Sequence, residues 1–312
     1  MTRYLVTGGA GFIGSNIVRK LIDKGEKVKV LDNFNTGKRE NLQDLMNDIE
    51  IIEGDFTCVQ TVLGAVKDVD VIFHQGAIPS VPRSILDPIK TNHANINGTL
   101  NLLHAAVEED VNRFIFASSS AAYGFNKTLP KQENMPGNPM SPYAVSKYAG
   151  EHYCKVFHHL YGLETISLRY FNVFGPRQDP HSKYAAVIPS FTQSILNDES
   201  PLIYGDGTQS RDFTYIDNVV SANLLAAEAS KLQGEVINVG SGSRIVLNEL
   251  VKYINTILGK NLPATYTRAR QGDVKHSQAD IGLAEQLIGY RPSISFHEGL
   301  TNTINWFISQ QA

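Results

Sequence analysis

Short apolar runs alternate with amphipathic stretches through the first half of the chain. The apolar runs are rich in β-branched and aromatic residues and end at charged or turn-forming residues, which predicts buried strands at 4–6, 28–31, 49–52, 71–73 and 114–116. Between them, apolar residues spaced three and four apart predict helices over 12–24, 95–108 and 143–160. This alternation predicts βαβ units with right-handed crossovers, and therefore an α/β fold with a doubly wound parallel sheet.

The regular alternation ends near Arg177. A polar stretch covers 176–184, and the second half of the chain mixes short strands, helices and loops. We expect residues 1–176 to form one domain, and residues 177–210 and 240–312 to form a smaller C-terminal lobe that binds the substrate. Residues 211–229 have the pattern of a strand and a helix, so we expect 211–239 to return to the first domain.

Composition and charge narrow the class of partner. The 312 residues carry a formal net charge of −3 and no basic stripe, which disfavours nucleic acid and favours a small molecule. No apolar run reaches about 18 residues and the N-terminus lacks a signal-peptide core, so we expect a cytoplasmic protein without membrane association. Two cysteines, Cys58 and Cys154, provide no disulfide framework. No paired Cys-x-x-Cys or His-Glu-x-x-His motif occurs, so we expect no metal site.

A glycine-rich segment, Gly8–Gly14, joins the first predicted strand to the first predicted helix. Glycines allow the backbone to approach a pyrophosphate, and the helix N-terminus offers free N–H groups to it. Asp32 stands 18 residues after Gly14, where its carboxylate would accept hydrogen bonds from a ribose diol and repel a 2′-phosphate. The combination predicts a Rossmann-like site for NAD rather than NADP. Asp55, after the third predicted strand, is either an adenine contact or an ordinary turn residue.

The segment Ser141–Lys147 carries the candidate chemistry. Ser141 is a suitable N-cap and Pro142 a suitable first helical residue, so Tyr143 and Lys147 lie at i and i+4 on one helical face. A phenol has a pKa near ~10, and we expect the ammonium of Lys147 and the helix N-terminus to favour its phenolate form as a base. Taken alone, such a pair is commonly a packed tyrosine beside a solvated lysine. Downstream of a dinucleotide site it predicts catalysis, with Lys147 also able to bind the nicotinamide ribose.

These motifs, with Asn95–Thr99, Ser118–Ala121 and Arg169–Pro176, resemble the extended short-chain dehydrogenase/reductase family along essentially the whole chain, and within it the UDP-hexose 4-epimerases. The resemblance implies that Tyr143, Lys147 and Ser119, at the end of the fifth predicted strand, are catalytic. It implies NAD contacts at Gly8, Gly11, Phe12, Ile13, Gly14, Asp32, Asn33, Asn35, Thr36, Gly37, Asp55, Phe56, Gln75, Ala77, Asn95, Ala117, Tyr143, Lys147 and Tyr170.

The same resemblance assigns the nucleotide-sugar site. It places Arg211 and Arg270 on the diphosphate, where a guanidinium pairs well with phosphate oxygens, and Asp273 on the uridine ribose. Further substrate contacts are implied at Ser119, Asn172, Val187 and Tyr204. Without the resemblance, an isolated arginine is more often a solvated surface charge, and Tyr204 is equally suited to a packed core.

Three segments resemble the subgroup that acts on UDP-N-acetylhexosamines, namely Ser80–Ile85, Arg177–Pro180 and Tyr184–Pro189. They imply substrate contacts at Ser80, Ser84 and Gln178. Members restricted to UDP-glucose and UDP-galactose resemble one another in a bulky tyrosine at the position of Ser277. A serine there leaves room for an N-acetyl group, although serine is also an ordinary loop residue.

The resemblance therefore implies an NAD-dependent isomerase that inverts C4 of a UDP-hexose. We expect it to interconvert UDP-GlcNAc and UDP-GalNAc, along with UDP-Glc and UDP-Gal, in polysaccharide biosynthesis. Alternatives are a UDP-glucose or UDP-glucuronate 4-epimerase, a dehydratase or net oxidoreductase, and a non-catalytic NAD-binding regulator. Ser120 and Ala121 stand where the family's dehydratases and decarboxylases carry acidic residues, which disfavours elimination. A homodimer through helices 95–108 and 143–160 is implied as well.

Overall fold

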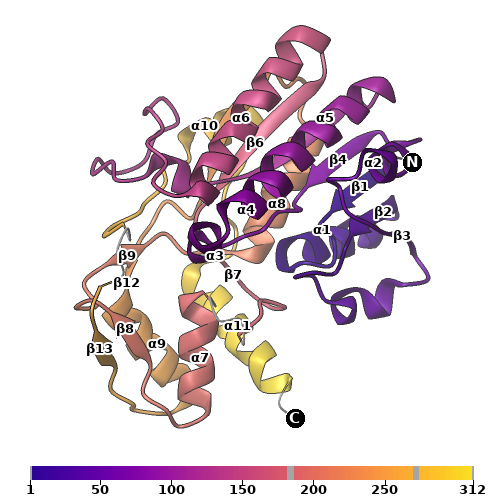
Figure 1. Ribbon diagram of the computed structural model, residues 1–312. Coiled ribbons are helices and arrows are strands. Elements are labelled where there is room, and N and C mark those ends of the chain that lie inside the picture. Colours follow the sequence, from indigo (N-terminus) through magenta and orange to yellow (C-terminus); the bar gives the residue numbers. More distant parts are fainter. Residues whose placement is uncertain (1, 181–185, 270–273, 311–312) are drawn as a thin grey trace.

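The computed structural model describes residues 2–180, 186–269 and 274–310 (Figure 1). Its centre is a seven-stranded sheet in which all neighbouring strands are parallel. The strand order is β11 (Glu235–Val239), β6 (Glu164–Tyr170), β5 (Arg113–Ser119), β4 (Val71–His74), β1 (Arg3–Thr7), β2 (Lys27–Asp32) and β3 (Ile49–Glu53). The order reverses between β1 and β4, so the predicted doubly wound parallel sheet is confirmed.

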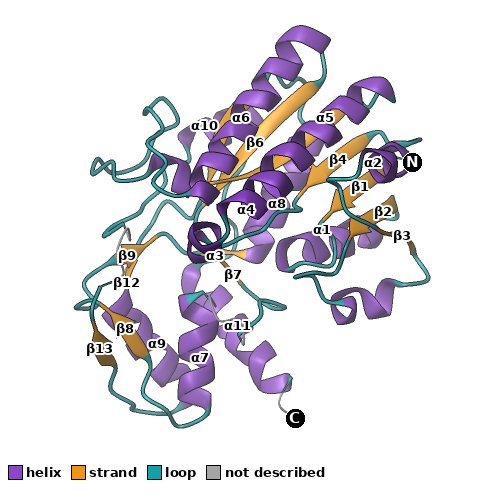
Figure 2. Ribbon diagram, in the orientation of Figure 1, coloured by secondary structure: helices purple, strands orange, loops and turns teal. Residues whose placement is uncertain are grey.

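Helices cover both faces of this sheet (Figure 2). One face carries α2 (Val59–Val66), α5 (Gly98–Glu108) and α6 (Pro142–Tyr161), and the other carries α1 (Phe12–Asp23), α8 (Ile216–Glu228) and α10 (Gly282–Ile288). Successive side chains of β5 enter the two cores in turn: Phe114 and Phe116 pack under α5 and α6, while Ile115 and Ala117 face α8. Burial on both faces explains why this strand is a continuous apolar run rather than an alternating one.

The predicted helix over 95–108 differs from the observed structure at its start. Its first turn, His93–Asn97, is π-helical, and regular α-helix begins only at Gly98. The Asn95 side chain accepts a hydrogen bond from the backbone N–H of Ile78 (2.7 Å) and donates to its carbonyl oxygen (3.2 Å) and to Ser146 Oγ (3.0 Å). The widened turn thus places a buried amide where it ties the segment after β4 to α6.

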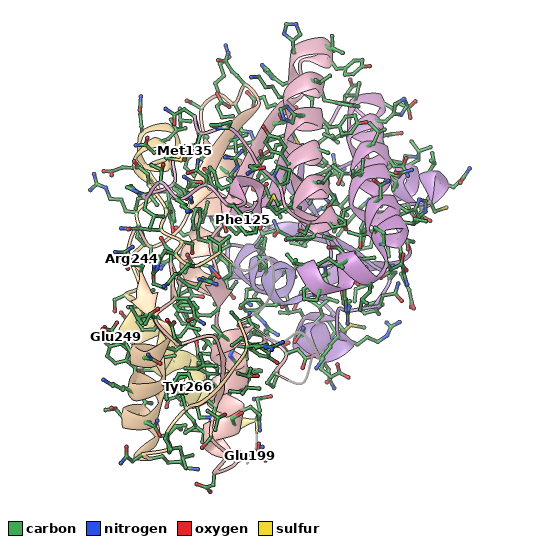
Figure 3. The ribbon with its side chains drawn as sticks, turned by 60° about the vertical axis from the view of Figure 1, so that its left-hand side comes forward. Phe125, Met135, Glu199, Arg244, Glu249 and Tyr266 are labelled. Atoms are coloured by element: carbon green, nitrogen blue, oxygen red, sulfur yellow. The ribbon has the colours of Figure 1, made fainter. Side chains whose placement is uncertain are left out.

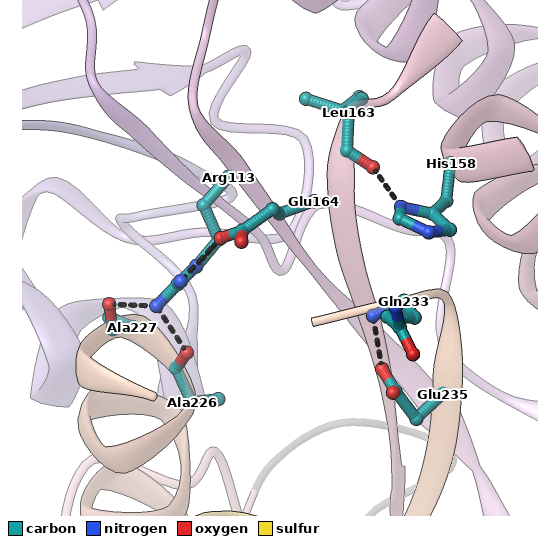
Figure 4. A network of polar contacts seen from close by, with 8 residues as sticks. All are labelled: Arg113, His158, Leu163, Glu164, Ala226, Ala227, Gln233 and Glu235. Carbon is teal, nitrogen blue, oxygen red and sulfur yellow. Dashed lines mark hydrogen bonds and ion pairs between the residues drawn. The ribbon is translucent and has the colours of Figure 1, made fainter. Parts of the chain in front are cut away.

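The segment after Arg211 packs against the central sheet. Helix α8 contacts α1 and β5, and β11 extends the sheet beside β6. Arg113, at the start of β5, pairs with Glu164 and donates to the carbonyl oxygens of Ala226 and Ala227 at the end of α8 (Figure 4). This buried guanidinium satisfies the last carbonyl groups of the helix, which have no partner within the helix itself.

The rest of the second half contains α7 (Val187–Leu196), α9 (Leu247–Leu258) and α11 (Phe296–Ser309). Three short strand pairs belong to the same half of the chain, namely β7 (Val173–Phe174) with β10 (Thr214–Tyr215), β8 (Leu202–Tyr204) with β13 (Thr265–Thr267), and β9 (Ser210–Arg211) with β12 (Ile245–Val246). Isolated bridges join Lys131 to Ala279 and Ser210 to His276. Figure 3 shows Arg244, Glu249 and Tyr266 on this part, and Phe125 and Met135 on the segment between β5 and α6.

Four short helical segments complete the description, namely η1 (Arg39–Leu45), α3 (Val81–Leu86), α4 (Pro88–Asn92) and η3 (Ser120–Tyr123). Among the helices of the described residues, none combines the length and the apolar character needed to cross a bilayer. Gly162 ends α6 in the left-handed conformation, and His158 Nδ1 lies 3.1 Å from the carbonyl oxygen of Leu163 in the same turn (Figure 4).

Candidate active site

In the turn between β1 and α1, two glycines let the backbone segments before and inside the helix lie in close contact. Gly8 has a φ of +66°, and a Cβ at Gly14 would lie 2.2 Å from the carbonyl oxygen of Gly8, so a larger residue at Gly14 cannot be accommodated there. Gly11 is the N-cap of α1, and no side chain caps the helix. The first turn of α1 therefore keeps backbone N–H groups and the positive end of the helix dipole for an anionic ligand, as a dinucleotide pyrophosphate requires.

Asp32 ends β2 beside this turn. Its carboxylate accepts hydrogen bonds from the backbone N–H groups of Ala10 (2.9 Å) and Phe34 (2.8 Å), which fixes its position relative to the glycine loop. Burial raises the pKa of Asp32, and the backbone hydrogen bonds oppose that rise. A Cβ at Gly37 would lie 2.9 Å from the carboxylate, so the surrounding loop is also close-packed.

The neighbouring predicted cofactor residues form two polar groups. In the first, Asn33 donates to Asp55 (2.9 Å), whose other oxygen accepts from the backbone and hydroxyl of Thr57 (2.8 Å each). Burial alone would raise the pKa of Asp55, but these hydrogen bonds outweigh it and leave the pKa lowered. In the second, the Gln75 amide lies 3.1 Å from the hydroxyl of Tyr170, at the end of β6.

The candidate catalytic residues converge at the carboxyl end of β5. Ser141 caps α6 by accepting a hydrogen bond from the backbone N–H of Ala144 (3.1 Å), which confirms the predicted helix start. Tyr143 follows in the first turn and interacts with Ser119, the last residue of β5. One turn later, Lys147 is buried and donates to the carbonyl oxygen of Ala117 (2.7 Å).

The expectation that Lys147 and the helix N-terminus favour the Tyr143 phenolate is wrong for the polypeptide alone. Desolvation raises the pKa of Tyr143, and only the hydrogen bond with Ser119 opposes it. Burial lowers the pKa of Lys147 to about 8, and its ammonium is engaged by Ala117. The physical reason is that residue spacing places two groups on one helical face but does not reveal how much water each loses.

A buried ion pair between α6 and β6 holds these catalytic candidates in place. Glu151, one turn after Lys147 on α6, forms a two-point contact with Arg169 of β6, with N–O distances of 2.8 and 2.7 Å. The same carboxylate accepts a hydrogen bond from the hydroxyl of Ser118, the neighbour of Ser119. The Arg169 guanidinium also lies 4.5 Å from the centre of the Tyr123 ring. These contacts fix α6 against the ends of β5 and β6.

Two cavities meet at Tyr143. The larger, of about 510 Å³, is lined by the predicted substrate residues Ser80, Asn172, Val187, Tyr204 and Arg211. The smaller, of about 420 Å³, is lined by Ser119 and Ser277, and it shares Tyr143, Asn172 and Arg211 with the larger one. Phe125 also lines the smaller cavity and is labelled in Figure 3. The structure therefore brings most of the predicted substrate residues to one continuous site.

Four predicted substrate residues are not placed in this site. Ser84 is fully buried, and its hydroxyl donates to the carbonyl oxygen of Val81 (2.7 Å). Gln178 donates to the carbonyl oxygen of Val173 (3.1 Å), and its own oxygen has no hydrogen-bond partner among the described residues. Arg270 and Asp273 lie outside the described residues.

Sequence reasoning overlooked several cavity residues. Gln209, Phe213 and Leu247 line the larger cavity, and Lys131 lines the smaller one. Lys131 follows a proline in a segment without helical or strand periodicity, so no local pattern marks it. Gln209 lies two residues before Arg211, the predicted diphosphate residue, and this proximity is the sequence signal that could have indicated it.

Comparisons with known proteins agree with this geometry. The NAD dependent epimerase/dehydratase family matches residues 4–240. The UDP-N-acetylglucosamine 4-epimerase of Methanobrevibacter ruminantium, solved in complex with UDP-N-acetylmuramic acid, is 45% identical, with 99% of each chain covered and a TM-score of 0.95. The UDP-glucose 4-epimerase of Thermotoga maritima, solved with UDP-glucose, is 39% identical, with 100% of each chain covered and a TM-score of 0.95.

A third solved structure is the UDP-glucuronic acid 4-epimerase of Bacillus cereus, in complex with UDP-glucuronic acid and NAD. It is 34% identical, with 100% of each chain covered and a TM-score of 0.92. These matches confirm the resemblance to NAD-dependent UDP-hexose 4-epimerases and the assignment of NAD as cofactor. The glycine turn, the uncapped α1 and the fixed Asp32 fit that cofactor. The chain belongs to the NAD dependent epimerase/dehydratase family.

Proposed function

We propose that this protein interconverts UDP-GlcNAc and UDP-GalNAc, along with UDP-Glc and UDP-Gal, by inversion at C4. The observation that carries the choice of sugar is the position of Ser277, whose small side chain lines the same cavity as Ser119 and Tyr143. A small residue at that wall leaves volume beside the reacting sugar for an acetamido group. The relative from Methanobrevibacter ruminantium, named for UDP-N-acetylglucosamine, supports this choice.

In this proposal Tyr143 removes the proton of the sugar 4-hydroxyl, and Ser119, which interacts with Tyr143, holds the sugar oxygen. When bound at the glycine turn and Asp32, NAD would supply the hydride chemistry at C4. Lys147 holds a positive charge one helical turn away, where it is suited to bind the ribose next to the nicotinamide. Returning the proton from Tyr143 to the sugar oxygen completes the cycle without net oxidation.

The sugar has to present both faces to the same catalytic groups, so the nucleotide is held while the hexose turns. We assign the anchor to Arg211, which lines both cavities. Its guanidinium donates to the carbonyl oxygens of Ser210 and Lys275 (3.0 Å each), which holds it at the junction of β9 and the segment that leads to Ser277. A fixed guanidinium is well suited to bind a diphosphate.

We further propose that the protein acts as a cytoplasmic homodimer with the predicted two-lobe division, 1–176 with 211–239 and then 177–210 with 240–312. Exposed apolar side chains on α6, namely Val145, Val156 and Leu160, support association through this helix. Cys58 and Cys154 are both free thiols, which supports a reducing compartment. Light scattering coupled to size-exclusion chromatography tests the dimer.

The proposed substrate is tested by comparing kcat/KM for UDP-GlcNAc, UDP-Glc and UDP-glucuronate with one preparation of purified protein. We expect turnover of UDP-GlcNAc, with UDP-Glc as a second substrate. Turnover of UDP-glucuronate alone, or release of a dehydrated product, would replace the proposed activity with that of another branch of the family.

A further inference from the structure

Lys131 is a buried cation in the wall of the sugar-binding cavity. Only 2% of its surface is exposed, and it lines the cavity of about 420 Å³ together with Ser119, Tyr143 and Ser277. It lies on the segment between β5 and α6, far in sequence from Ser277. The proposed reaction assigns no role to Lys131.

An isolated parallel bridge joins Lys131 to the segment that carries Ser277. Residue Lys131 pairs with Ala279, its N–H donates to the carbonyl oxygen of Gln278 (2.7 Å), and its own carbonyl oxygen accepts from Asp280 (2.9 Å). Residues that are paired across a parallel bridge lie side by side. Lys131 and Ser277 therefore come from two joined segments, and both line the smaller cavity.

The ammonium of Lys131 has few hydrogen-bond partners for a buried charge. It donates to the carbonyl oxygen of Asn126, and across the described residues it forms no ion pair with a carboxylate within 4.0 Å. An ammonium has three N–H donors, so a single carbonyl leaves donors for a ligand. Burial lowers the pKa of Lys131, because removal from water destabilises its charged form. A ligand oxygen would reduce that destabilisation.

We propose that Lys131 is a specificity-determining residue that donates a hydrogen bond to the acyl oxygen of a 2-acetamido group on the sugar, opposite Ser277. The inference rests on the proposed function, since it assumes that the acetamido group occupies the space beside Ser277. In this arrangement Ser277 provides the volume and Lys131 provides the donor. A sugar with a plain 2-hydroxyl lacks the carbonyl oxygen at this place, so only the acetylated substrate gains the contact.

The test compares Lys131→Met with Lys127→Met in the full-length protein. Methionine keeps the apolar stem of Lys131 and removes its charge, while Lys127 is an exposed lysine of the same segment that lines neither cavity. For wild type and both variants, kcat/KM is measured for UDP-GlcNAc, UDP-Glc and UDP-glucuronate. Binding of UDP, measured by calorimetry, reports whether the nucleotide site is intact.

We expect Lys131→Met to lower kcat/KM for UDP-GlcNAc about 10- to 100-fold relative to UDP-Glc, the range of a hydrogen bond from a charged donor, with UDP binding unchanged. Lys127→Met should leave the ratio at its wild-type value. An equal loss for both sugars would overturn the proposal, because a disturbed 124–131 segment affects both alike. Selective weakening of UDP-glucuronate, with UDP-GlcNAc unaffected, would also overturn it in favour of a carboxylate ligand.

The design separates this inference from the proposed function. If wild-type protein epimerises UDP-GlcNAc but the substrate ratio of Lys131→Met equals that of wild type, only the role of Lys131 is contradicted. If wild-type protein does not accept UDP-GlcNAc, the proposed sugar is wrong and the role of Lys131 is contradicted with it.

Discussion

Lys147 donates a hydrogen bond of 2.7 Å to the carbonyl oxygen of Ala117, so a buried ammonium joins α6 to the carboxyl end of β5. Its Nζ also lies 4.9 Å from the centre of the Phe116 ring. The contact places a positive charge one turn from Tyr143, and no carboxylate in the described part of the chain forms an ion pair with it. Burial of this charge lowers the pKa of Lys147 to about 8, and that shift has a measurable consequence for stability.

Between pH 8 and 10.5 the stability of dinucleotide-free protein should rise relative to a Lys147→Met variant. Folded Lys147 releases its proton near pH 8, whereas an unfolded lysine holds it up to its ordinary value of 10.5. The unfolded chain thus binds more protons in this interval, so raising the pH favours the folded state. We expect the difference in free energy of unfolding to grow by about 3 kcal/mol, measured by urea denaturation. If the difference in free energy of unfolding between the two proteins does not change with pH, burial does not destabilise the charged form of Lys147.

Replacing Tyr143 by Phe should remove the proposed acid/base and keep the fold. The ring remains, while the hydroxyl that interacts with Ser119 is lost. We expect the rate to fall by at least ~10²-fold, the scale of a positioned acid/base, with NAD still bound and the thermal midpoint little changed. Turnover close to that of wild type would contradict the role of Tyr143.

Alanine at Gly14 should abolish retention of the dinucleotide. The new Cβ would lie 2.2 Å from the carbonyl oxygen of Gly8, so the turn must open at the point where the pyrophosphate is expected. Gly64→Ala, in α2, is the matched control, because a Cβ there meets nothing within 4 Å. Purified wild type and Gly64→Ala should release NAD on denaturation, and Gly14→Ala should release little. Equal NAD content in all three would mean that the cofactor does not occupy this turn.

Tyrosine at Ser277 should exclude the acetylated sugars selectively. Ser277 lines the cavity beside Tyr143, and an aromatic ring there would occupy the space proposed for the acetamido group. We expect Ser277→Tyr to lower kcat/KM for UDP-GlcNAc far more than for UDP-Glc, because steric exclusion acts on one substrate only. Ser277→Ala, which keeps the volume, serves as control. If the ratio is the same in all three proteins, Ser277 does not select the sugar.

Periodicity and turn chemistry predicted the features that local sequence determines. The apolar run at 114–116 marks β5 because its side chains enter cores on both faces of the sheet. Tyr143 and Lys147 share a helical face because Ser141 and Pro142 set the start of α6. The Gly8–Gly14 turn was recognisable because strand, glycines and helix follow one another directly.

Features that depend on distant parts of the chain escaped local reasoning. Lys131 enters the cavity wall only because it pairs with Ala279, and nothing in its own segment indicates that contact. The π-helical turn at Asn95 occurs together with side-chain hydrogen bonds to Ile78 and Ser146, which residue spacing does not reveal. The direction of the pKa shift at Tyr143 was missed for the same reason, since desolvation is a property of the folded surroundings.

The central claim is that hydride leaves C4 of a UDP-hexose and returns to the same carbon within one active site. The most direct test is to incubate the purified protein, without added cofactor, with UDP-GlcNAc that carries deuterium at C4, and to follow the products by NMR. We predict UDP-GalNAc that keeps its deuterium at C4, with no accumulation of free NADH. Loss of the label to water, or stoichiometric reduction of added NAD, would contradict this account.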